Sequence, residues 1–155
     1  EKIAELERKK IISEVSQRFT TNIYTHNETP YLPYVNNMGS VDYYNIMPLV
    51  FRYSKINLNI TLRSIRSGMP LRAIDIMGAG GFLLTNYQSD FLKDFVPGED
   101  MVMYDSVEDC ISKCEYYLKH EDERKSIALN GYKKVKEKYN YVYRIKQILD
   151  IVDSR

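Results

Sequence analysis

The sequence has almost no excess of charge of either sign and no long apolar run. Lys and Arg number 22 and Asp and Glu number 21, which gives a formal net charge of +1. A broad nucleic-acid-binding surface usually brings a clear basic excess, so nucleic acid is not an expected partner. No apolar run approaches the roughly 20 residues that a membrane-spanning helix needs. The charged stretch from Glu1 to Lys10 also lacks the apolar core of a secretory signal peptide.

Cysteine and histidine are scarce, with two of each. Cys110 and Cys114 lie four residues apart on an expected helix, which is not the C-x-x-C spacing of a redox pair. No second cysteine pair completes a zinc site, and His26 and His120 are far apart in the sequence. We therefore expect two half-buried thiols in a reducing compartment, the cytoplasm, and no bound metal.

The composition that remains is that of a globular domain. The chain has 155 residues, of which 44% are hydrophobic and 28% are charged, enough for one domain with its own core. The first residue is Glu, and the opening segment has the pattern of a helix already under way. We expect a fragment of a longer protein, although a processed terminus would give the same beginning.

Strand-like and helix-like segments alternate along the chain. Strands are expected at 19–24, 56–60, 82–85 and 101–104, and helices at 1–18, 48–53, 71–77, 106–118, 120–136 and 140–152. Residues 27–46 form a long irregular connection that can include a short strand at 41–44. This order predicts an α/β fold, a parallel sheet flanked by helices with a helical carboxyl-terminal tail.

The segment from Met69 to Asn86 is the most informative part of the chain. A short helix is followed by Gly78, Gly80 and Gly81, and then by an apolar strand. Glycines allow positive φ and a close approach of the backbone, either to a ligand or to a packed neighbour, and both interpretations are open.

Polar residues within and just after the preceding strand are further candidates for contact with a ligand. Ligands of open parallel sheets bind beyond the carboxyl ends of the strands, which favours Thr61 and Arg63 after the strand at 56–60. In that strand, Asn57 and Asn59 alternate with apolar residues. We interpret Asn57 as structural and Asn59 as facing the cleft.

Several segments resemble the CgeB-like glycosyltransferases, a group first named for spore maturation, in their order and spacing. The segments are 54–59, 70–75, 80–85, 90–99, 117–124, 128–131 and 139–144, within a resemblance that covers about residues 40–152. Such proteins are similar to GT-B glycosyltransferases, which have two Rossmann-like halves facing a cleft. The resemblance implies that residues 19–155 are the carboxyl-terminal, nucleotide-sugar-binding half and that residues 1–18 are the helix connecting the two halves.

The resemblance also implies roles for particular residues. In the wider GT-B group a carboxylate in the helix before the glycine turn binds the ribose hydroxyls of the donor. Asp75 has that position here, where the family more usually has Glu. The diphosphate leaving group needs positive charge, for which Arg72 is the first candidate and Arg63 the second. The full set of predicted donor-binding residues is Asp75, Asn59, Thr61, Gly78, Gly80 and Gly81, and no metal is expected to assist.

Two departures from the family pattern leave the function open between two hypotheses. Ser67 stands where retaining members often have a second Glu, and the segment 60–63 lacks the usual His before Arg63. The leading hypothesis is a hexosyltransferase-type enzyme whose acceptor site lies in an amino-terminal half, so that this fragment alone transfers little or no sugar. The alternative is a non-catalytic Rossmann-like protein-interaction module that has lost the donor site. The stereochemistry of transfer is likewise open.

Overall fold

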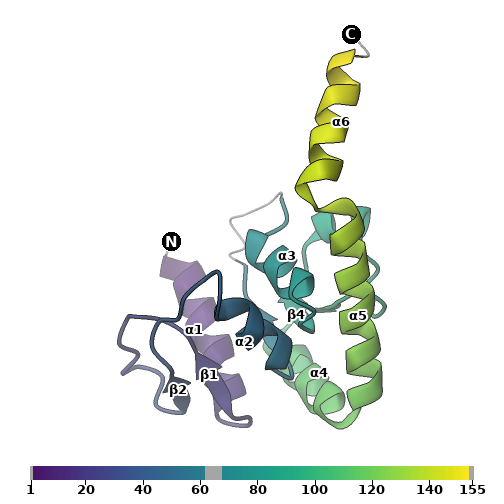
Figure 1. Cartoon of the computed structure of the whole chain (residues 1–155). Coiled ribbons are helices and arrows are strands. Elements are labelled where there is room, and N and C mark those ends of the chain that lie inside the picture. Colours follow the sequence, from purple (N-terminus) through teal and green to yellow (C-terminus); the bar gives the residue numbers. More distant parts are fainter. Residues whose placement is uncertain (1, 62–67, 154–155) are drawn as a thin grey trace.

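The computed structural model describes residues 2–61 and 68–153, and its elements form two parallel sheets flanked by helices (Figure 1). The strands are β1 (Thr21–Ile23), β2 (Val35–Asn37), β3 (Asn57–Asn59), β4 (Leu83–Asn86) and β5 (Val102–Tyr104). The helices are α1 (Lys2–Ser16), α2 (Met47–Tyr53), α3 (Leu71–Gly78), the 3-10 helix η1 (Ser89–Lys93), α4 (Val107–Lys119), α5 (Glu121–Lys138) and α6 (Tyr141–Asp153). The predicted α/β Rossmann-like class is confirmed.

The larger sheet has the strand order β3-β4-β5, and all its strands are parallel. Successive side chains of β4 enter two different cores, since strand side chains alternate between the faces. Leu84 packs with residues of α1 and α4 on one face. Leu83 packs with residues of α2, α3 and α5 on the other. The sheet is thus the middle layer of three, which explains why the segment 82–84, which leads into β4, is apolar at every position.

The smaller sheet pairs β1 with β2 in parallel, and it corrects one prediction. The strand within the 27–46 connection lies at Val35–Asn37, not at 41–44. Residues 43–46 form a turn instead, because the Asp42 carboxylate accepts hydrogen bonds from the backbone N–H groups of Tyr44 (3.1 Å) and Asn45 (2.6 Å). Such local side-chain bonds compete with strand formation.

Two predicted helix starts, at 106 and 140, are confirmed by their caps. The Ser106 hydroxyl accepts a hydrogen bond from the Asp109 backbone N–H at 3.1 Å, at the start of α4. The Asn140 side-chain oxygen accepts one from the Tyr143 backbone N–H at 2.8 Å, at the start of α6. Both bonds satisfy N–H groups that have no partner inside the helix. From its capped start, α6 extends away from the body of the molecule (Figure 1).

The glycine turn after α3 closes the helix and lets the sheet approach it. Gly80 has φ +80° and its N–H donates to the Met77 carbonyl, while the Gly81 N–H donates to the Ile76 carbonyl, both at 2.9 Å. This is the Schellman pattern of helix termination. A Cβ on Gly81 would lie 2.6 Å from the Phe51 carbonyl oxygen, so only glycine fits. These contacts give Gly80 and Gly81 an architectural role.

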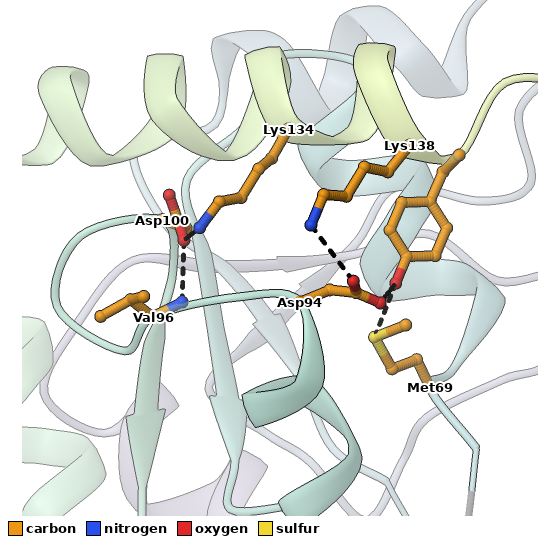
Figure 2. A network of polar contacts seen from close by, with 7 residues as sticks. Met69, Asp94, Val96, Asp100, Lys134 and Lys138 are labelled. Atoms are coloured by element: carbon orange, nitrogen blue, oxygen red, sulfur yellow. Dashed lines mark hydrogen bonds and ion pairs between the residues drawn. The ribbon is translucent and has the colours of Figure 1, made fainter. Parts of the chain in front are cut away.

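Ion pairs join α5 to the loop that follows η1 (Figure 2). Lys134 forms an ion pair with Asp100, whose carboxylate also accepts a hydrogen bond from the Val96 N–H at 2.8 Å. One turn further along α5, Lys138 lies 3.4 Å from Asp94. No helix in the described part of the chain is both long and apolar enough to cross a membrane.

Candidate functional site

Four polar side chains join the carboxyl ends of β3 and β4. The Asn59 amide donates to the hydroxyls of Thr61 and Thr85, each at 3.0 Å. The Thr61 backbone N–H donates to Asn86 Oδ1 at 2.7 Å, and Asn86 Nδ2 donates back to the Thr61 carbonyl at 3.1 Å. The four residues therefore hold the strand ends in a fixed arrangement at the edge where ligands of parallel sheets bind.

A cavity of about 430 Å³ opens at this edge, between the strand ends and α1. Its polar lining includes Lys10, Thr61, Asn86, Tyr87, Asp105 and Ser106. Thr61 is the predicted site residue that lines it, whereas Asn59 lies beneath, with 8% of its surface exposed. Lys10 is an addition from the structure, as is Glu7 of the same helix, because the sequence pattern gave no reason to place the charged residues of the first helix at the site.

The start of α4 faces this cavity but is poorly suited to bind an anion. The Asp109 carboxylate accepts a hydrogen bond from the Asp105 backbone N–H at 3.1 Å, and Ser106 caps the helix. Hydrogen bonds from the Glu108 backbone N–H and the Ser106 side chain lower the pKa of Glu108, so it stays ionised. Carboxylates at this helix start disfavour a diphosphate there. Positive charge must come from other elements.

A second group of polar side chains lies at α3 and the 43–46 turn. It consists of Tyr43, Arg72 and Asp75, and we call it the Asp75 cluster. The Tyr43 hydroxyl, from the 43–46 turn, donates a hydrogen bond to Asp75 Oδ2. The guanidinium carbon of Arg72 lies 5.2 Å from the centroid of the Tyr43 ring and 5.7 Å from that of Phe51. The hydrogen bond to Asp75, with a smaller effect of burial, raises the pKa of Tyr43.

The structure thus divides the predicted site residues into three sets. Arg72 and Asp75 meet at Tyr43, while Asn59 and Thr61 belong to the network at the strand ends. Gly80 and Gly81 terminate α3, and Gly78, the last residue of that helix, faces Val135 of α5. Arg63 and Ser67 lie outside the described residues.

Sequence reasoning missed Tyr43, which lies in the connection that was expected to be irregular. Its length was the available signal, since long connections without regular structure are often functional. Asn57 has the structural role predicted for it, because its amide donates to the carbonyls of Phe51 (2.8 Å) and Phe82 (3.2 Å). The ligand-binding roles of all the other residues remain predictions.

No group of three His, Cys, Asp or Glu residues within 2–61 and 68–153 could hold a metal ion. Cys110 and Cys114 are both free thiols and both buried. The expectation of metal-independent chemistry stays a prediction.

Comparison with known proteins gives a family and a fold. A family model described as glycosyl transferase-like matches residues 6–150. The crystal structure of Anabaena Alr3699/HepE in complex with UDP and glucose aligns with a TM-score of 0.73 at 10% sequence identity. The alignment covers 94% of this chain and 44% of the HepE chain, so the chain spans less than half the length of that protein. A search of curated protein sequences found no match.

Proposed function

From the premise that this chain belongs to the glycosyl transferase-like family, we propose that it is the nucleotide-sugar-binding half of a GT-B glycosyltransferase. Within that group we propose the CgeB-like type, with the hexosyltransferase chemistry that the resemblance implies. HepE, of which this fold covers 44%, was solved with UDP and glucose, which makes a UDP-linked sugar the first donor to test.

The observation that carries the proposal is the Asp75 cluster. Asp75 and Arg72 are three residues apart on α3, so their Cβ atoms are about 5–6 Å apart on one helix face. A nucleoside diphosphate likewise presents hydroxyl donors on its ribose and, next to them, an anionic diphosphate. The carboxylate accepts the hydroxyl hydrogen bonds, and the guanidinium stabilises the negative charge that develops on the leaving diphosphate.

The network at the strand ends and the adjoining cavity complete the proposed site. Thr61 and Asn86 line the cavity, and Lys10 and Glu7 place one charge of each sign at its α1 side. We propose that donor groups beyond the ribose reach this edge of the sheet. Arg63, which follows Thr61, keeps its proposed role as the second cation for the diphosphate.

The proposed partner is an acceptor-binding amino-terminal half of the same protein. The exposed face of α6 supports this proposal, since it carries large apolar side chains that the described part of the chain leaves uncovered: Val142, Ile145, Ile148, Leu149 and Val152. Exposed apolar stripes of this kind mark interaction surfaces. We propose that the acceptor site and the general base belong to that half, that transfer needs no metal, and that the reaction takes place in the cytoplasm.

Isothermal titration of the 155-residue chain with UDP, GDP, dTDP and ADP tests the donor site. We expect at least one diphosphate to bind and Asp75→Ala to weaken that binding about tenfold or more, because hydrogen bonds to charged groups contribute roughly 1.5–3 kcal/mol. Asp122→Ala, which removes an exposed carboxylate at the start of α5, is the matched control and should bind like the parent. In a separate assay with a sugar donor, the chain alone should transfer little or no sugar to an acceptor.

Failure of every diphosphate to bind would reject the donor-site assignment and favour the alternative function, a non-catalytic interaction module. Sugar transfer by a longer protein that includes the amino-terminal half would reject that alternative.

A further inference from the structure

We propose that Tyr43 is a specificity-determining residue of the donor site, whose phenol oxygen accepts a hydrogen bond from one ribose hydroxyl while Asp75 accepts from the other. This inference rests on the proposed function, since it concerns the same site. It adds a residue from the 43–46 turn, 32 positions before Asp75 in the sequence.

The hydrogen-bonding capacity of the pair is the first step of the argument. The Tyr43 hydroxyl uses its single O–H to donate a hydrogen bond to Asp75 Oδ2. The oxygen of a phenol that donates in this way still has lone pairs, and an ionised carboxylate can accept about four hydrogen bonds. The pair therefore offers acceptors on two separate groups. A vicinal ribose diol presents two neighbouring hydroxyl donors, which match this arrangement better than one carboxylate alone.

The protonation state of the pair is consistent with this direction of hydrogen bonding. The bond to Asp75 raises the pKa of Tyr43 above its usual value, so the phenol keeps its proton at neutral pH. Asp75 then remains the acceptor of the phenol proton.

The position of the Tyr43 ring is set by its neighbours. The Asp42 side chain caps the turn that carries it. The Tyr44 ring meets its edge at a centroid distance of 5.6 Å and an angle of 89°, and the Arg72 guanidinium lies over it. Ordering a free side chain would cost binding free energy, so a ring already held in place loses less on binding.

The ring also remains accessible. Tyr43 is 44% exposed, and Asp75 is only partly buried, so a ligand can reach the pair from solvent. Tyr43, Asp75 and Arg72 thus place a neutral acceptor, an anionic acceptor and a cation within one accessible cluster. This combination fits a ribose joined to a diphosphate.

The test is a thermodynamic cycle in which the Tyr43 hydroxyl and the ribose hydroxyls are removed separately and together. The full chain and its Tyr43→Phe variant are titrated with UDP and with 2′,3′-dideoxy-UDP, which lacks both hydroxyls. Tyr43→Phe should weaken UDP binding about tenfold, the loss expected for one hydrogen bond, and leave binding of the dideoxy analogue unchanged. Tyr53→Phe, at an exposed position on α2, is the matched control and should bind both ligands like the parent.

The two ligands separate recognition from a structural effect. Equal weakening of both ligands would assign Tyr43 a structural role and overturn the inference, as would UDP binding that is unchanged or tighter in Tyr43→Phe. If the parent binds UDP and only Asp75→Ala weakens it, the proposed function stands and the Tyr43 assignment falls. If the parent binds none of UDP, GDP, dTDP and ADP, both fall.

Discussion

At the scale of single residues, Tyr104 has an unusual environment. The residue is 2% exposed, and its hydroxyl has no hydrogen-bond partner among the described residues. Burial also raises the pKa of this phenol well above its usual range, with smaller contributions from Cys110 and Cys114. An unsatisfied buried hydroxyl costs stability, because the group has lost its hydrogen bonds to water.

We therefore predict that Tyr104→Phe raises the free energy of unfolding by about 1 kcal/mol. Urea denaturation monitored by circular dichroism measures the change. Tyr53→Phe, which alters a tyrosine that is 79% exposed, should leave the free energy of unfolding unchanged. A loss of stability in Tyr104→Phe would instead indicate that the hydroxyl has a partner such as a buried water.

At the scale of elements, the packing of α5 depends on one glycine. A Cβ on Gly131 would lie 2.4 Å from the Asp100 carbonyl oxygen and 3.3 Å from Met77 Sδ. The Asn130 amide, one residue before it, donates to the Glu99 carbonyl at 3.0 Å. Close approach at Gly131 thus allows α5 to pack on both α3 and the loop before β5, where the ion pair of Lys134 adds a further contact (Figure 2).

Gly131→Ala should lower the free energy of unfolding by about 2 kcal/mol or more, although alanine is ordinarily the better helix former by roughly 1 kcal/mol. The clash is with backbone, which cannot move aside as a flexible side chain can. The control is Gly78→Ala in α3, where the added Cβ would meet Val135 Cγ1 at an ordinary 3.4 Å. Urea denaturation that gave equal stabilities for the two variants would contradict this account of the α5 packing.

At the scale of the whole molecule, none of the described side chains of α6 belongs to either hydrophobic core. This helix extends from the body after the Asn140 cap (Figure 1), and Ile145 and Leu149, four residues apart, are each 54% exposed. Side chains this exposed gain little from folding of the chain by itself. We expect these side chains to stabilise the contact with the proposed amino-terminal half instead.

The double substitution Ile145→Ser and Leu149→Ser should change the free energy of unfolding of this chain by less than about 0.5 kcal/mol. In a longer protein that contains both halves, the same substitutions should weaken the contact between the halves. Ile127→Ser, in the core at 3% exposure, should lower the free energy of unfolding in both contexts. Urea denaturation of the short and the long proteins measures these effects. A large loss of stability in the short chain would show that α6 packs on the described domain itself.

Whether a feature of this molecule can be predicted from the sequence depends on how far apart in the chain its interacting residues lie. Helix starts at Ser106 and Asn140 were predicted because a cap bonds to a backbone group three residues away. The strand at Val35–Asn37 was wrongly predicted at 41–44. It forms by pairing with β1, whose residues lie 14 positions earlier in the chain. Pairing of this kind leaves little local signal.

The same distinction applies to the candidate site. The sequence by itself determined the α/β class, the alternation of the main helices and strands and the positions of Arg72 and Asp75 on one helix, since these follow from periodicity and short-range bonding. Only the tertiary structure decided that Tyr43 meets Asp75 and that Asn59 joins Thr85, 26 residues further along the chain. Both contacts join segments that are far apart in the chain, so they depend on packing of the whole domain.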